Sequence, residues 1–264
     1  MSTGTKTIAF ANNKGGSGKS TTCSNVGFVL AREGYRVLLV DADMQQNLSL
    51  SFFGEEDVLD FSESGENLFT AIRDDSDASA FIRKTRYENL SLLPSGILMS
   101  GAEFELYGKK DREGTLARVL EKAKNSGEYD FILIDSPPTL GMLVMNIMCA
   151  SDYLLIPIEA SPWGLFGLAN MLDFYGKAKE INTSLSLLGI AITKADERKN
   201  YFRQTVDFLS ELDNVRTFKN YIRIDSAVEW AQDNSQPVAA YKKSSRSAKE
   251  YTEMTKEMLE YVHR

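Results

Sequence analysis

Cysteine and histidine are scarce in this chain of 264 residues, and their scarcity argues against several kinds of chemistry. The two cysteines, Cys23 and Cys149, follow neither a metal-binding nor a redox spacing. Two isolated cysteines do not supply the ligands of an iron–sulfur carrier, and they favour a reducing compartment. The one histidine, His263, is the penultimate residue, so histidine-based acid–base catalysis is not expected.

Long apolar runs are also missing. No segment is apolar for long enough to cross a bilayer, and the first residues do not resemble a signal peptide. We therefore expect a cytoplasmic protein. Hydrophobic residues make up 43% of the chain and charged residues 25%, which is typical of a folded globular domain.

Negative charge dominates, with a formal net charge of −7, but it is unevenly distributed. Residues 41–80 contain eleven Asp and Glu side chains and a single basic residue, Arg73, which gives this stretch a charge of −10. The remainder therefore carries +3. Because local patches decide whether a protein binds a polyanion, the overall charge does not exclude nucleic acid as a partner.

Short aliphatic runs alternate with helical patterns along the chain, which is typical of βαβ units. We expect strands at 7–11, 36–41, 90–93, 131–135, 153–158, 187–193 and 215–218, and helices at 20–33, 115–124, 140–150, 164–180, 201–212 and 249–262. The acidic residues 48–85 should form short helices and loops outside the sheet. The pattern predicts a single α/β domain over 1–264, with a mostly parallel twisted sheet between two layers of helices. We expect no helix-turn-helix extension before the first strand, which should begin near Thr7.

A glycine-rich loop connects the first expected strand to the first expected helix. It keeps the last three positions of the phosphate-binding loop G-x-x-x-x-G-K-[ST], whereas Asn13 replaces the first glycine. Backbone N–H groups at a helix N-terminus favour phosphate, so this loop predicts nucleotide binding. The residues expected to contact the nucleotide are Lys14, Gly15, Gly16, Ser17, Gly18, Lys19, Ser20 and Thr21.

The same loop contains a second lysine. Lys14 lies five residues before Lys19, and both cations would crowd the same oxygens if they faced one triphosphate. Only Lys19 occupies the usual lysine position. We therefore interpret Lys14 as a residue that can reach the nucleotide of a neighbouring subunit.

Two expected strands end in aspartate after an aliphatic run, and the carboxyl ends of parallel strands face the ligand. Asp135 follows 131–134 and is placed like a carboxylate that supports Mg²⁺, together with the Ser20 hydroxyl. Asp41 and Asp43 follow 37–40. Asp43 is better placed to orient an attacking water, while Asp41 either belongs to the metal group as an outer residue or forms a turn.

Residues 14–21, 41–47 and 132–138 resemble the three nucleotide motifs of the ParA/MinD superfamily of deviant Walker ATPases. Three later segments are similar to the partition branch, the ParA/Soj family. These are Thr193-Lys194-Ala195-Asp196-Glu197-Arg198, Tyr221-Ile222-Arg223 followed by Glu229, and Gln236-Pro237-Val238. The resemblance spans nearly the whole chain and is weakest at 48–125.

The resemblance implies a P-loop ATPase that uses ATP and Mg²⁺ and forms a homodimer with the nucleotides at the interface. Lys14 would contact the partner's ATP, Lys19 would contact its own, and Asp43 would orient water. Thr193, Lys194 and Ile222 would complete the nucleotide site. Such a protein is a weak ATPase alone and is stimulated by a centromere-binding, ParB-like protein.

The sequence departs from the family pattern at three positions. Met44 and Ile222 replace prolines, which puts local backbone geometry in question, and Ser17 replaces a common valine. Lys194-Ala195-Asp196 also resembles the guanine-reading motif of GTPases. GTP therefore remains an alternative to ATP, although the second lysine favours ATP.

Partition ATPases bind nucleoid DNA without sequence preference, through salt-sensitive phosphate contacts. The matching segments make Arg198 and Arg223 the first candidates for that contact. Lys242, Lys243 and Arg246 form a further basic cluster. Whether the DNA is a plasmid or a chromosome is left open.

The alternative is a membrane-associated, MinD-like positioning ATPase, which needs a C-terminal amphipathic helix with a basic polar face. The expected last helix instead carries four glutamates on its polar side, and an acidic helix is repelled by anionic lipid. They are Glu250, Glu253, Glu257 and Glu260. We therefore expect no membrane partner.

Overall fold

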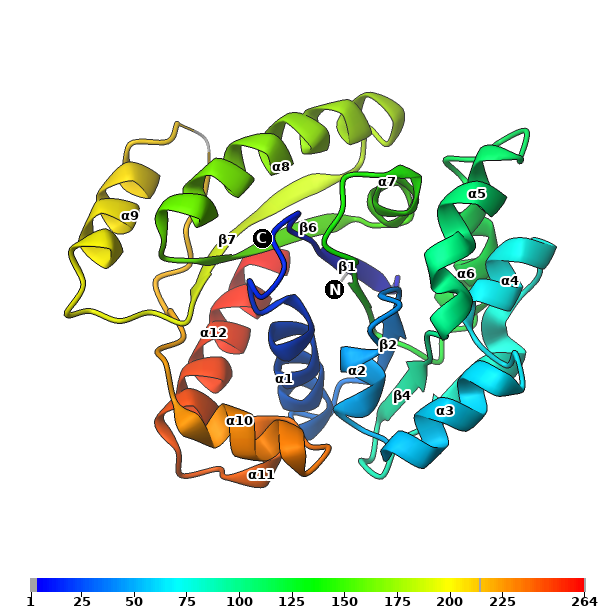
Figure 1. The fold of residues 1–264 in the computed structure, drawn as a ribbon, viewed down its shortest axis with the longest axis horizontal. Helices are drawn as coiled ribbons and strands as arrows, with labels where there is room; N and C mark the ends of the chain where they lie inside the picture. Colours follow the sequence, from blue (N-terminus) through cyan, green and yellow to red (C-terminus); the bar gives the residue numbers. More distant parts are fainter. Residues whose placement is uncertain (1–3, 214, 264) are drawn as a thin grey trace.

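The computed structural model describes residues 4–213 and 215–263 and arranges them around one twisted β-sheet (Figure 1). Within this part of the chain, seven strands pair in the order β3-β4-β2-β5-β1-β6-β7. Their bounds are Lys6–Phe10 (β1), Val37–Asp41 (β2), Arg83–Lys84 (β3), Leu90–Leu93 (β4), Phe131–Asp135 (β5), Tyr153–Glu159 (β6) and Ser186–Thr193 (β7). All pairs are parallel except β3 with β4.

Helices occupy most of the connections between the strands. The α-helices are Lys19–Arg32 (α1), Asn47–Leu50 (α2), Glu55–Glu63 (α3), Leu68–Asp74 (α4), Ala102–Tyr107 (α5), Thr115–Asn125 (α6), Met142–Cys149 (α7), Pro162–Ile181 (α8), Asn200–Ser210 (α9), Ser226–Asp233 (α10), Val238–Tyr241 (α11) and Arg246–Val262 (α12). Two 3₁₀ helices, Ala78–Phe81 (η1) and Ile97–Gly101 (η2), precede β3 and α5.

The helices cover both faces of the sheet, because successive strand residues point to opposite sides. Ala9 of β1 belongs to a buried core that includes Val144 of α7 and residues of α4, α6 and α8. Its neighbour Phe10 belongs to a second core, with Val29 of α1 and Met254 of α12. The three-layer α/β/α architecture predicted from the sequence is confirmed.

The central strands bring the functional loops to one edge of the sheet. Every residue of β2 and β5 is buried, as expected for parallel strands covered on both faces. In the strand register, Asp135 pairs with Phe10 on one side and with Asp41 on the other. The loops that follow β1, β2 and β5 therefore leave the sheet side by side.

Two expectations about the sheet were wrong. Residues 215–218 do not form a strand, since only an isolated bridge joins Thr217 to Ile190 of β7. The segment then leaves β7 and returns to it through a second bridge between Arg223 and Ala195, so no continuous ladder forms. Residues 83–84, expected outside the sheet, add a two-residue antiparallel edge, β3.

The polar side of the last helix, α12, is less exposed than the sequence predicted. Its apolar residues Tyr251, Met254 and Met258 are buried, as the spacing predicted. Glu257, however, is 7% exposed and accepts hydrogen bonds from the backbone N–H groups of Lys219 and Asn220. Glu257 and Glu250 of α12 therefore bind the backbone of residues 219–223, which lie beside β7. The polar side of α12 is thus not entirely exposed to solvent.

Candidate functional site

The loop between β1 and α1 leaves the start of α1 open to a ligand. Gly16 and Gly18 have φ values of 75° and 83°, a left-handed conformation that glycine adopts without strain. Gly18 is the N-cap of α1, and no side chain caps the helix there. A cavity of about 520 Å³, here called the nucleotide cavity, opens at this point. Its lining includes Gly15, Gly16, Ser17, Gly18, Lys19, Ser20 and Thr21, an arrangement suited to a phosphate group.

Lys19 lies inside this cavity. It is 6% exposed, and its Nζ donates a long hydrogen bond, 3.4 Å, to the carbonyl oxygen of Lys14. Burial lowers the pKa of Lys19, and the negative charges of Asp135 and Asp43 oppose that effect. A buried ammonium group without a close anion is suited to receive a phosphate.

Lys14 points to a different environment, at the junction of β6 and α8. Its Nζ donates to Glu159 Oε2 at 2.7 Å and to Ser161 Oγ at 3.0 Å. Ser161 also caps α8 by accepting a hydrogen bond from the N–H of Gly164 at 3.2 Å. Glu159 and Ser161 were not predicted from the sequence, because a single acidic residue at the end of a strand carries no distinctive signal. Within the protomer, Lys14 is therefore held away from the cavity that contains Lys19.

The environment of the Asp135 carboxylate indicates whether the site suits a metal ion. Its carboxylate is fully buried, and neither oxygen has a hydrogen-bond partner among the residues that the structure describes. Burial raises the pKa of Asp135 well above its usual range, and the negative charge of Asp41 raises it further. Such a carboxylate is stabilised by a cation, so Asp135 and the Ser20 hydroxyl at the cavity wall fit Mg²⁺. No group of three His, Cys, Asp or Glu side chains forms a metal cage in 4–213 and 215–263, so phosphate and water would supply the other ligands.

Asp41 and Asp43 organise the loop after β2 in different ways. The Asp41 carboxylate accepts from Ser49, through N–H at 2.8 Å and Oγ at 2.7 Å, and from the N–H of Asp43 at 3.1 Å. Burial raises the pKa of Asp41 to about 6 in spite of these bonds. Its oxygens already have partners, which favours a role in shaping the loop over direct metal contact. Asp43 lines the nucleotide cavity, and its Oδ1 accepts a hydrogen bond from the N–H of Gln45 at 3.0 Å.

The opposite wall of the nucleotide cavity comes from distant parts of the chain. Thr193, Lys194 and Ile222 line it, as expected from the family segments. The Thr193 hydroxyl lies 2.8 Å from the carbonyl oxygen of Ser17, which ties the end of β7 to the phosphate loop. The rest of this wall was not predicted to be part of the nucleotide site, because residues 223–225, α10 and α12 reach the cavity only through tertiary packing. It consists of Arg223, Ile224, Asp225, Val228, Glu229, Gln232 and Tyr251.

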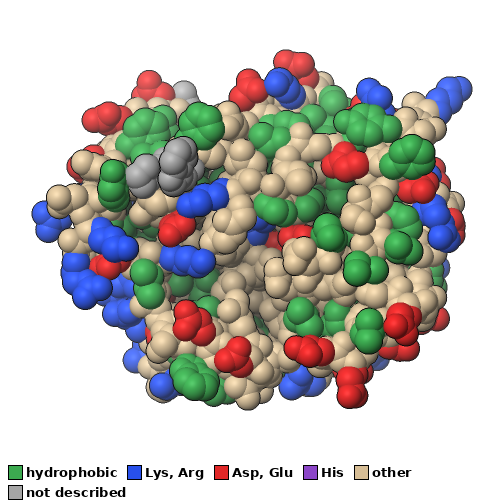
Figure 2. All heavy atoms as spheres, in the orientation of Figure 1, with side chains coloured by type: hydrophobic (Ala, Val, Ile, Leu, Met, Phe, Trp, Pro, Cys, Tyr) green, Lys and Arg blue, Asp and Glu red, His purple; other side chains and the backbone are tan. Residues whose placement is uncertain are grey.

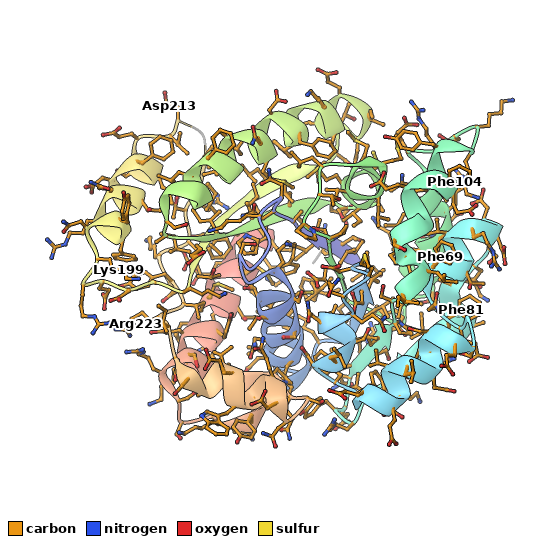
Figure 3. The ribbon with its side chains drawn as sticks, viewed as in Figure 1. Phe69, Phe81, Phe104, Lys199, Asp213 and Arg223 are labelled. Carbon is orange, nitrogen blue, oxygen red and sulfur yellow. The ribbon has the colours of Figure 1, made fainter. Side chains whose placement is uncertain are left out.

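The five basic residues proposed for DNA contact fall into two groups. Arg198, Arg223 and Arg246 line one pocket of about 390 Å³, next to the nucleotide cavity. Lys242 instead lines a separate hollow with Trp230 and Tyr241, on the outside of α10 and α11, and its neighbour Lys243 is exposed. Lys and Arg side chains gather between α9 and α10 (Figure 2), around the positions where Lys199 and Arg223 are labelled in Figure 3.

The phosphate loop at a helix N-terminus, with carboxylates at the ends of the two neighbouring strands, defines a P-loop nucleotide-binding protein. Residues 5–187 match a family model described as an AAA domain. The chain is 36% identical over 254 residues to the sporulation initiation inhibitor protein Soj of Bacillus subtilis, across 96% of this chain and 98% of that protein. It is 32% identical to the chromosome-partitioning ATPase Soj of Treponema pallidum, across 96% and 97%. The chain belongs to the ParA/Soj family of ATPases.

A solved structure agrees with this assignment. The fold matches that of cobyrinic acid a,c-diamide synthase from Mycobacterium smegmatis, crystallised with ADP and magnesium, at a TM-score of 0.82 and 28% identity. The match covers 98% of this chain and 96% of that one. In the described part of the chain, none of the helices combines the length and apolar character that a membrane span requires.

Proposed function

We propose that this protein is a DNA-partition ATPase whose ATP-bound form is a face-to-face homodimer. The observation that carries the proposal is the contrast between the two lysines of one loop. Lys19 is buried in its own nucleotide cavity, whereas Lys14 is held outside that cavity by Glu159 and Ser161. One loop thus provides a cation for its own nucleotide and another that is available to a second nucleotide.

The residues of the cavity have distinct tasks in ATP hydrolysis. Lys19 and the open N-terminus of α1 would neutralise the phosphates. Ser20 and Asp135 would hold Mg²⁺, which neutralises the charge that develops between the β- and γ-phosphates. Asp43, at the cavity wall with a free carboxylate oxygen, would accept a hydrogen bond from the attacking water and orient it. Asp41 would keep that loop in shape through Ser49.

Lys14 would report on the γ-phosphate of the partner subunit. To reach it, the ammonium group exchanges Glu159 and Ser161 for phosphate oxygens, which form stronger charge-assisted bonds. Hydrolysis removes those oxygens, and the lysine returns to Glu159. Dimerisation would thereby depend on the state of the nucleotide.

The face that carries the nucleotide cavity also exposes large apolar side chains. Phe104 of α5 is 82% exposed, and Ile97, Leu98 and Tyr107 nearby are each more than half exposed. Hydrophobic side chains gather over α5 and α7, across the central hollow from the basic side (Figure 2). An apolar patch of this kind is typical of an association surface, and a second copy facing this one would cover it.

DNA and a ParB-like partner follow from the same proposal. Dimerisation would place two basic sides on one particle, so non-specific DNA binding would require ATP and would weaken with salt. Release would follow hydrolysis stimulated by the centromere-binding partner, and the protein would associate with the nucleoid. The membrane alternative has less support, because the apolar face of α12 is buried and Glu253 and Glu260 are exposed.

A direct test is DNA binding, measured by fluorescence anisotropy with ATP, with ADP and without nucleotide, at two salt concentrations. We expect binding with ATP alone, weaker at the higher salt concentration. Arg223→Glu should remove DNA binding while ATP-dependent dimerisation persists. Equal binding in all three nucleotide states, or co-flotation of the ATP form with anionic liposomes, would contradict the proposal.

A further inference from the structure

Three arginines converge on a pocket that shares a wall with the nucleotide cavity. This arginine pocket, of about 390 Å³, is lined by Ala195, Asp196, Glu197, Arg198, Arg223, Ile224 and Arg246. Arg223 and Ile224 line the nucleotide cavity as well. Two backbone hydrogen bonds join residues 222–224 to Ala195, just after β7. The N–H of Ala195 donates to the carbonyl oxygen of Ile222, and the N–H of Ile224 donates to that of Ala195. The pocket is therefore a fixed part of the fold.

Each arginine of the pocket has a carboxylate beside it. Arg198 Nε donates to Asp196 at 2.8 Å. Arg223 donates to Glu250 through Nε at 2.5 Å and lies 3.3 Å from Glu197 through its terminal nitrogen. Arg246 lies 3.9 Å from Glu250. Three positive and three negative side chains thus face one another, and the cluster has no net charge. A phosphate that enters the pocket gains little from long-range attraction.

The two carboxylates beside Arg223, Glu250 and Glu197, differ in their burial and in how closely they contact the guanidinium. Glu250 has a side chain that is 13% exposed, and it accepts both the backbone N–H of Arg223 at 2.8 Å and the Nε of that guanidinium. It therefore fixes the direction of Arg223. Glu197 is 47% exposed, makes the longer contact to Arg223 and accepts a hydrogen bond from the Tyr221 hydroxyl. Its charge opposes a phosphate without being needed to orient the arginine.

We propose that Glu197 is an internal counter-ion that limits the affinity of the arginine pocket for DNA phosphate, while Glu250 positions Arg223 for that contact. This inference rests on the proposed DNA-binding function. One neutralised pocket binds DNA weakly, so two pockets on a dimer are needed for stable binding. Glu197 thereby makes DNA binding depend on dimerisation and hence on ATP.

The test compares Glu197→Gln with Glu253→Gln in DNA-binding titrations of the full chain with ATP at low salt. Both substitutions remove one negative charge, and glutamine at 197 keeps an acceptor for Tyr221. Glu253 serves as the control because it is 55% exposed on α12, pairs with Lys256 and does not line the pocket. We expect Glu197→Gln to raise DNA affinity about two- to fivefold for each pocket, because an exposed ion pair contributes about 0.2–1 kcal/mol. Glu253→Gln should change it by less than about twofold.

A second variant, Glu250→Ala, separates the two roles. It also removes a negative charge, yet we expect weaker DNA binding because Arg223 loses its orientation. An affinity gain in Glu197→Gln no larger than in Glu253→Gln, or a gain in Glu250→Ala, would overturn the inference. These outcomes leave the proposed function intact as long as the unmodified protein binds DNA with ATP. Absence of any ATP-dependent DNA binding by the unmodified protein would instead refute the function itself.

Discussion

At the scale of single residues, the proposed ATP-dependent dimerisation depends on the contact between Lys14 and Glu159. Their ion pair is short, 2.7 Å, but both side chains are partly exposed, 25% and 35%. Pairs of this kind contribute about 0.2–1 kcal/mol, because solvent screens them. A triphosphate carries more charge and can therefore displace Glu159. The contact is strong enough to hold the lysine in a lone protomer and weak enough to be exchanged.

Glu159→Gln should therefore favour the ATP-dependent dimer. The variant loses the ionic part of the contact, so less free energy is spent on releasing Lys14. We expect half-maximal dimerisation with ATP at about two- to fivefold lower protein concentration, measured by sedimentation velocity. Glu33→Gln is a suitable control, since that residue pairs with Arg32, far along α1 from the loop. Dimerisation unchanged or weakened in Glu159→Gln would contradict this role.

Asp135→Asn should stabilise the protein without nucleotide and remove its Mg²⁺-dependent activity. Because the pKa of Asp135 in the folded state lies well above its ordinary value of 3.8, the folded state binds a proton more tightly than the unfolded state. The charged carboxylate thus lowers stability increasingly as pH rises above 3.8. We expect Asn to raise the free energy of unfolding by about 1–3 kcal/mol at pH 8 and by little below pH 4.

Urea unfolding at both pH values, with and without Mg²⁺ and ATP, checks this prediction. The ligands should stabilise the unmodified protein more than the variant, if Asp135 supports the metal as proposed. A variant that is less stable at pH 8 than the unmodified protein would show that Asp135 has a structural partner.

At the scale of an element, the phosphate loop contains glycines that serve different purposes. A Cβ at Gly18 would lie 3.2 Å from Thr193 Oγ1, and its φ of 83° disfavours any side chain. A Cβ at Gly15 would meet nothing within 4 Å, and the backbone at Gly15 is not in the left-handed conformation. Gly18 is therefore needed for the loop itself, whereas the space at Gly15 is free within one protomer.

The pair Gly15→Val and Gly18→Ala separates dimerisation from nucleotide binding. Gly18→Ala should cost about 1–2 kcal/mol of stability and weaken ATP binding strongly. Gly15→Val should bind ATP as a monomer, because its side chain would occupy space that the partner approaches. Calorimetric titration and light scattering measure the two effects. A normal ATP dimer in Gly15→Val would show that the partner does not approach there.

The sequence predicted the central elements well because their signals are local. The buried aliphatic runs of β2 and β5 and the glycines before α1 are short patterns that require no knowledge of distant partners. Residues 215–224 could not be predicted in the same way. Their path depends on non-local bridges to Ile190 of β7 and to Ala195 just after it, and on Glu250 and Glu257 of α12.

The candidate site shows the same division between local and distant signals. The phosphate loop, Asp43 and Asp135 stand next to strand ends and were predicted from spacing. Glu159, which holds Lys14, and the wall formed by α10 reach the site through packing alone. Their residue types are common on any protein surface, so the sequence contains no feature that distinguishes them.

At the scale of the whole molecule, basic and large apolar side chains both gather on the face that carries the nucleotide cavity (Figure 2). Basic side chains lie toward α9 and α10, where Tyr201 and Trp230 are also exposed, and a further group of hydrophobic side chains lies over α5 and α7 (Figure 2). The net charge of −7 is therefore a poor guide to the partners of this face. A dimer would bury the apolar side chains over α5 and α7 and present two basic regions, which would account for the proposed DNA binding by an acidic protein.

The most direct measurement of the central claim is sedimentation velocity of the unmodified protein and of Lys14→Ala, each with ATP and with ADP. We expect a dimer only for the unmodified protein with ATP. Lys14→Ala should remain a monomer under all conditions while it still binds ATP, because Lys19 is intact. A dimer of Lys14→Ala with ATP, as stable as that of the unmodified protein, would show that Lys14 does not bind the partner's nucleotide.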